Sequence, residues 1–142
     1  MIAGLASIIF IPLLAISMVH MLWAFGSTYP TKTQKDLART VAGFKGIEKM
    51  PPRPASFAVS ILTLMAGIWA LALTDPTQSL ILTLGGIALA IVFLARGAIG
   101  YTKWWREKTP EEPFATFDVK VYSPLCLFLG AGFGLLTLLR LI

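Results

Sequence analysis

The chain contains very few of the residues from which catalytic and metal-binding sites are usually built. Its 142 residues include a single cysteine, Cys126, and a single histidine, His20. One cysteine cannot form a disulfide within the chain, and one cysteine with one histidine falls short of the ligand set of a zinc site. We therefore expect no internal disulfide, no metal site and no cofactor.

Charged residues are scarce as well. Only 13% of the residues are charged and 56% are hydrophobic, a composition outside the range of soluble domains. Four windows, 2–26, 55–74, 77–95 and 121–139, contain no Asp, Glu, Lys or Arg. Because a helix crosses a bilayer with about 20 mostly apolar residues, each window predicts a membrane-spanning helix.

The fold class expected from these windows is all-α, an integral membrane four-helix bundle in a single transmembrane domain, 1–142. The helices should span about 2–26, 55–74, 77–97 and 121–141. Alternation with period two, which a membrane β-barrel requires, is absent. The second connection is only "TDPT", so we expect the second and third spans to be antiparallel neighbours.

The first connection, "TYPTKTQKDLARTVAGFKG", predicts a short amphipathic helix. Thr33 and Asp36 have the spacing of a helix-start capping pair, and Leu37, Val41 and Phe44 share one helical face. Such a helix is expected to lie on the membrane surface with its apolar face toward the bilayer. An irregular loop is the alternative interpretation.

Basic residues are distributed unevenly between the two sides of the predicted membrane. Six lie between positions 27 and 54 and four between 101 and 120, whereas the opposite side has only Arg140. The positive-inside rule then places both basic connections in the cytoplasm and both termini outside, in a bacterial inner membrane. The net charge of +5 favours membrane lipids as partners, and nucleic acid is not expected because the basic residues follow the membrane boundary.

Polar residues near the span boundaries collect at the end of the bundle that carries the basic connections. An ionisable residue within a span is a candidate for function, because it is costly there without a partner. We expect Arg96 to pair with Asp118 and Tyr122 to lie beside them, since a guanidinium grips a carboxylate with two donors. The predicted ligand-binding residues are Arg96, Asp118, Tyr122, His20, Trp23 and Lys103.

Each of these residues also has a simpler structural interpretation. Arg96 would extend to the interface alone while Asp118 caps a helix. His20 beside Trp23 would be an interfacial group with a satisfied hydrogen bond, and the tryptophans would form an aromatic belt.

The stretch "YSPLC" leaves two possible starts for the fourth span. Ser123 is a suitable N-cap and Pro124 a suitable first helical residue. If the helix instead begins near Asp118, Pro124 would kink it and leave a backbone carbonyl free.

Small residues recur at four-residue spacing in three spans, which is the pattern that lets helices approach closely in lipid. One such face serves packing within the monomer, and additional faces favour a homo-oligomer, a dimer or trimer. The pairs are Gly130 with Gly134, Ala66 with Ala70, and Gly86 with Ala90.

Three motifs, "SMVHMLWAFGSTYP", "ARGAIGY" and "FDVKVYSPLCLFLG", resemble an uncharacterised family of small bacterial membrane proteins with four predicted helices. The resemblance rests on His-x-x-Trp, Arg-Gly and Tyr-Ser-Pro-Leu-Cys motifs and reaches both ends of the chain. That family carries only a domain-of-unknown-function label. The resemblance therefore supports the fold and the choice of residues and implies no activity.

Two functions are consistent with the sequence. The first is binding or transport of a lipid or other amphiphile in support of envelope integrity, with an anionic head at Arg96 and Lys103. The alternative is a membrane-embedded enzyme that uses His20, Asp118 and Tyr122 for acid/base chemistry on a lipid-like substrate. The enzyme hypothesis lacks a paired-carboxylate, metal-binding or nucleophile-and-base arrangement, so binding is favoured.

Overall fold

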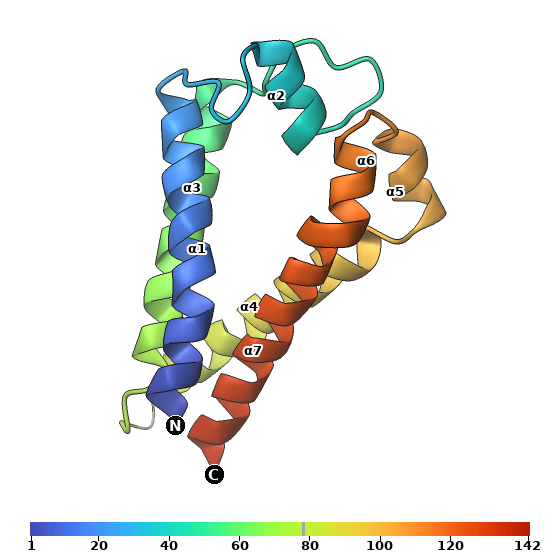
Figure 1. Cartoon of the computed structure of the whole chain (residues 1–142). Coiled ribbons are helices and arrows are strands. Elements are labelled where there is room, and N and C mark those ends of the chain that lie inside the picture. Colours follow the sequence, from blue (N-terminus) through green and yellow to red (C-terminus); the bar gives the residue numbers. More distant parts are fainter. Residues whose placement is uncertain (78) are drawn as a thin grey trace.

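Every regular element among the described residues, 1–77 and 79–142, is helical in the computed structural model (Figure 1). Gln78, which falls in the third predicted span, lies outside the described residues. Four helices are long and apolar enough to cross a membrane, which confirms the predicted class. The elements are α1 (Ile2–Ala24), α2 (Gln34–Val41), α3 (Arg53–Ala72), α4 (Leu80–Ile99), α5 (Lys103–Lys108), α6 (Phe114–Phe117), the π-helical turn η1 (Asp118–Tyr122) and α7 (Ser123–Leu141).

The long helices associate as two antiparallel pairs, α1 with α3 and α4 with α7. A pair of buried serines joins α1 to α3: Ser60 Oγ donates to the Ser17 carbonyl over 2.8 Å and lies 3.1 Å from Ser17 Oγ. Glycines bring α4 and α7 together, because a Cβ on Gly130 would lie 2.7 Å from the backbone nitrogen of Leu94. Close backbone approach thus replaces the hydrophobic effect in holding this pair together.

The two pairs meet near the chain termini and diverge toward α2 (Figure 1). A buried apolar cluster of α1, α3, α4 and α7 residues fills the end where they meet. The second and third spans are indeed consecutive and antiparallel, but α3 makes most of its contacts with α1. Trp69 supplies a link to α4, since its Nε1 donates to the Leu82 carbonyl over 3.1 Å.

The predicted amphipathic helix is present as α2, with Thr33 as its N-cap. Thr33 Oγ1 accepts from the Asp36 backbone N–H over 3.1 Å, as the capping pair predicts. Leu37 and Ala38, however, are fully buried by other parts of the protein. Part of the apolar face of α2 is therefore covered by protein, whereas Phe44, which the sequence pattern puts on the same face, is 45% exposed, and contact of α2 with the bilayer surface stays a prediction.

Backbone contacts fasten the segment after α2 to the connection between α4 and α7. The Glu111 N–H donates to the Gly43 carbonyl over 3.2 Å, and the Lys45 N–H donates to the Lys108 carbonyl over 3.1 Å. Arg39 Nε also lies 3.2 Å from Glu111 Oε2, an ion-pair distance without hydrogen-bond geometry. The connection between α1 and α3, which contains α2, is thereby held against the connection between α4 and α7.

The last span begins well before Pro124. Helical backbone runs from Phe114 to Leu141, interrupted by η1, where the Ser123 N–H donates to the Asp118 carbonyl five residues earlier. Pro124 has no N–H for the carbonyl four residues before it, and a π turn accommodates that loss. Ser123 is itself helical and caps nothing, so the early start is the correct alternative.

Candidate functional site

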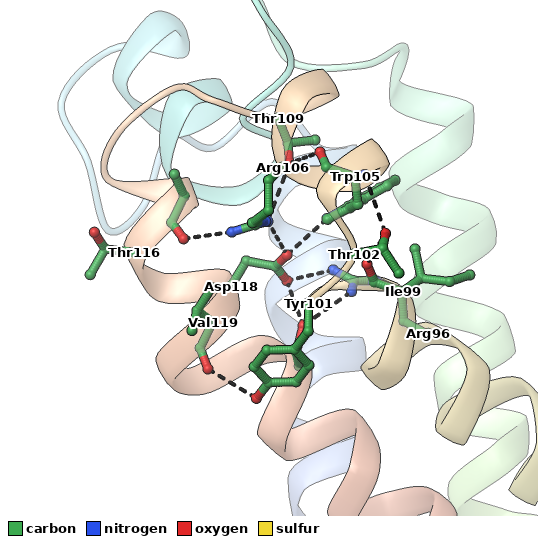
Figure 2. Close-up of polar contacts among 12 residues, drawn as sticks. Arg96, Ile99, Tyr101, Thr102, Trp105, Arg106, Thr109, Thr116, Asp118 and Val119 are labelled. Atoms are coloured by element: carbon green, nitrogen blue, oxygen red, sulfur yellow. Dashed lines mark hydrogen bonds and ion pairs between the residues drawn. The ribbon is translucent and has the colours of Figure 1, made fainter.

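Asp118 is the centre of the polar cluster at the α2 end of the bundle (Figure 2). Its side chain is fully buried, and four donors surround the carboxylate. A buried carboxylate is stable only when its lone pairs are satisfied. The donors are Arg96 Nη2 at 2.8 Å and Ser123 Oγ at 3.2 Å on Oδ1, and Trp105 Nε1 at 2.8 Å and Arg106 Nη2 at 2.6 Å on Oδ2.

Arg96 enters this cluster from the last turn of α4. Its guanidinium carbon lies 5.1 Å from the centre of the Trp105 ring, so the cation contacts both a carboxylate and an aromatic face. Gly100, one turn further on, leaves the space that Ser123 occupies, since a Cβ at that position would overlap the Ser123 hydroxyl. The predicted pairing of Arg96 with Asp118 is therefore confirmed.

Arg106, from α5, is the second cation on Asp118. Its Nη1 donates to the Ala115 carbonyl over 2.7 Å, and its Nη2 also reaches Thr109 Oγ1 at 3.3 Å. Arg106 therefore ties α5, α6 and η1 together through one side chain. Its Nε is buried and has no hydrogen-bond partner among the described residues.

The charges in the cluster do not cancel. Two guanidinium groups, from Arg96 and Arg106, share the single carboxylate of Asp118. The side chain of Arg96 is 33% exposed and that of Arg106 is 24% exposed, whereas that of Asp118 is inaccessible. The surplus positive charge is therefore presented outward.

Tyr122 lies one turn beyond Asp118 but makes no hydrogen bond to the carboxylate. Its hydroxyl donates to the Thr40 carbonyl in α2 over 3.0 Å, and its ring packs against Phe114 with the ring centres 5.7 Å apart. Tyr122 thus helps to fasten α2 to the last span.

His20 and Trp23 form a second group, on the α1–α3 pair. Their ring centres are 4.6 Å apart, and His20 Nδ1 donates to the Ile16 carbonyl over 2.9 Å. Both line a partly open pocket of about 110 Å³ between α1, α2 and α3. The other lining residues are Val41, Ala42, Met50, Pro51, Ala55, Ser56 and Val59.

Lys103 is not part of either group. Its side chain is 91% exposed, and its partner among the described residues is Glu107, at 3.8 Å in the next turn of α5. Its predicted role in ligand binding stays a prediction that no contact in the structure supports.

The three residues of the enzyme hypothesis are not joined to one another. No hydrogen bond or ion pair links any two of His20, Asp118 and Tyr122, all of which are described. The oxygens of Asp118 are already occupied by four donors. The structure therefore does not join these three residues into one hydrogen-bonded group, and the enzyme alternative stays a prediction.

Comparison with models of known protein families assigns the chain to one family. The model of a family described as "Protein of unknown function (DUF3995)" matches residues 13–133. The chain belongs to the DUF3995 family. No curated protein and no solved structure matches it. Both the Asp118 cluster and the His20 pocket lie within the span that the DUF3995 model covers.

Two residues of the cluster in this DUF3995 protein escaped the sequence analysis. From the sequence, Arg106 is one of four basic residues between positions 101 and 120, and Trp105 is one of the tryptophans expected in an aromatic belt. The neighbouring Trp104 is 58% exposed and fits the anchor interpretation, whereas Trp105 points inward to Asp118. No residue spacing in the sequence predicts that Trp105 points inward and Trp104 outward, because their orientation depends on how α5 folds back against η1.

Proposed function

We propose that this protein binds an anionic amphiphile of the inner membrane in support of envelope integrity, with the charged head at the Arg96–Asp118–Arg106 cluster. The observation that carries the proposal is the pairing of two guanidinium groups with one carboxylate. A phosphate or carboxylate head supplies the missing negative charge at the boundary of the spans, where such charge is attracted to basic side chains.

The surface beside the cluster has room for such a head. A shallow pocket of about 350 Å³ is lined by Arg106, Glu112, Lys120 and Val119, among others. Glu112 is engaged by Thr116, whose backbone N–H and hydroxyl both donate to it. Val119 and Val121 are 37% and 49% exposed and provide apolar surface for the acyl chains.

A thermal shift measurement in zwitterionic nanodiscs tests this function. Added phosphatidylglycerol should raise the melting temperature, because a ligand that binds only the folded state stabilises it. Arg96→Ala and Lys120→Ala should each reduce the shift. Arg96→Ala leaves Asp118 three donors, and Lys120 is exposed, so both variants are expected to fold.

Lys49→Ala is the matched control, since it removes the same charge from an exposed position in the other basic connection. It should leave the shift unchanged. Equal shifts for the wild type and for Arg96→Ala and Lys120→Ala would contradict the proposal.

A homo-oligomer, a dimer or trimer, is part of the same proposal. Gly130 is used within the monomer, but the space next to Gly134 is open. The outer face of α7 around Gly134 then supports close approach of a second α7, as small residues do in membranes.

A further inference from the structure

The pocket between α1, α2 and α3 contains polar groups that the protein does not satisfy itself. Ser56 is 5% exposed, and its hydroxyl has no hydrogen-bond partner among the described residues. The serine one turn further along α3, Ser60, is by contrast fully engaged with Ser17. Because Ser56 lines the pocket and its hydroxyl is not engaged by the protein, that hydroxyl is available to an occupant of the pocket.

His20 offers a second polar group, and its hydrogen bond to the protein determines which ring nitrogen can accept. The Ile16 carbonyl can only accept, so Nδ1 of His20 carries the hydrogen in the bond that joins them. In the neutral ring, Nε2 is then the unprotonated nitrogen, and no described residue donates to it. The side chains of His20 and Ser56 therefore offer the pocket an acceptor, Nε2, and a hydroxyl that both donates and accepts.

The rest of the pocket is uncharged. None of its lining residues is Asp, Glu, Lys or Arg, so a phosphate or an ammonium inside it would be left without a partner. A volume of about 110 Å³ suits a group of a few heavy atoms, since a cavity of about 150 Å³ holds benzene. Size and lining together select a small, neutral, hydroxyl-bearing group.

The wall of the pocket continues onto surface that faces lipid. Val59 lines the pocket and is 38% exposed, and Leu62, three residues further on the same face of α3, is 65% exposed. An alkyl chain attached to the hydroxyl-bearing group can leave the pocket along these side chains without burying any polar atom.

We propose that this pocket binds the hydroxyl head of a neutral single-chain amphiphile, such as a monoacylglycerol, through His20 Nε2 and Ser56 Oγ. The site shares no lining residue with the Arg96–Asp118–Arg106 cluster and is separate from the anionic site proposed above.

The single histidine makes a direct test possible. In protein labelled with ¹⁵N at histidine and held in nanodiscs of phosphatidylcholine, the ring signals belong to His20 alone. Without ligand, the spectrum of the neutral ring should show Nδ1 protonated and Nε2 free. Monooleoylglycerol should move the Nε2 signal, and methyl oleate, which has the same chain but no hydroxyl, should not.

Ser56→Ala should weaken monooleoylglycerol binding about three- to tenfold, the effect of one hydrogen bond. Ser7→Ala is the control, because Ser7 is exposed on α1 and bonds only the Ala3 carbonyl of its own helix. It should leave the affinity unchanged.

Protonation of Nε2 in the free protein, an equal response to methyl oleate, or unchanged affinity in Ser56→Ala would each overturn the inference. If monooleoylglycerol does not move the Nε2 signal but phosphatidylglycerol still raises the melting temperature, the neutral site is refuted and the anionic site is retained. If monooleoylglycerol moves the Nε2 signal but phosphatidylglycerol does not raise the melting temperature, only the anionic site is refuted.

Discussion

Nη2 of Arg96 lies 2.8 Å from Oδ1 of Asp118 and joins the last turn of α4 to the π turn in front of α7. The two residues are 22 positions apart. Because η1 continues directly into α7 and Arg96 lies in the last turn of α4, the ion pair fixes these two helices at the end where the two halves of the molecule diverge (Figure 1).

Removing the carboxylate should destabilise the protein strongly. Asp118→Ala leaves Arg96 and Arg106 without their shared partner, a loss on the order of 3 kcal/mol in the free energy of unfolding. Glu107→Gln, which affects an exposed ion pair, should cost less than about 1 kcal/mol. Thermal and denaturant unfolding in detergent, followed by tryptophan fluorescence, would compare them, and equal stabilities would contradict the central role of Asp118.

The two adjacent tryptophans should respond differently to the same substitution. Trp105→Phe removes the Nε1 donor to Asp118 but keeps an aromatic ring near Arg96, so we expect a loss of about 1.5–3 kcal/mol, as for hydrogen bonds to charged groups. Trp104→Phe changes an exposed side chain and should alter stability by less than about 0.5 kcal/mol. Similar unfolding midpoints would refute the assignment of Trp105 to the cluster.

Alanine substitutions at two glycines after α2 would distinguish a steric clash from backbone strain as causes of lost stability. Gly43 and Gly46 both have positive φ, 65° and 72°, so alanine is strained at either position by about 1–2 kcal/mol. A Cβ on Gly43 would also overlap the Phe114 ring, whereas the space beside Gly46 is open. Gly43→Ala should therefore unfold at the lower denaturant concentration, and proteolysis after α2 should be faster in that variant.

Sequence reasoning succeeded where a single residue or a short pattern decides the outcome. Uncharged windows gave the four spanning helices, and Thr33 with Asp36 gave the start of α2. Arg96 and Asp118 were paired correctly because ionisable groups at a span boundary need partners.

Sequence reasoning was incomplete where several segments meet. The inward turn of Trp105 and the reach of Arg106 depend on how α5 folds against η1. The pocket at His20 depends on α2 covering the top of α1 and α3. The burial of Leu37, likewise, follows from contacts between distant segments and leaves no periodic signal in the sequence.

The glycines of α7 should divide between internal packing and self-association. Gly130→Ala places a Cβ against the Leu94 backbone and should cost about 1–3 kcal/mol through overpacking. Gly134→Leu should leave the fold intact but reduce the dimer or trimer fraction measured by crosslinking in membranes. Gly4→Leu, at another glycine with open space, is the control, and an unchanged oligomer in Gly134→Leu would argue against this interface.

Topology can be tested with fusions at the C-terminus. The excess of basic residues in the connections around α2 and α5 predicts that both termini lie outside the cytoplasm. A C-terminal alkaline phosphatase fusion should be active and a fluorescent protein fusion dark. The reverse result would place the Asp118 cluster on the outer side of the membrane.

Native mass spectrometry of protein gently extracted from its own membrane tests the central claim most directly. The account predicts that the wild type retains an anionic lipid, that Lys49→Ala retains it equally, and that Arg96→Ala releases it while staying folded. Equal retention of anionic lipid by Arg96→Ala and the wild type would contradict the claim that the surplus charge of the Arg96–Asp118–Arg106 cluster holds the head group.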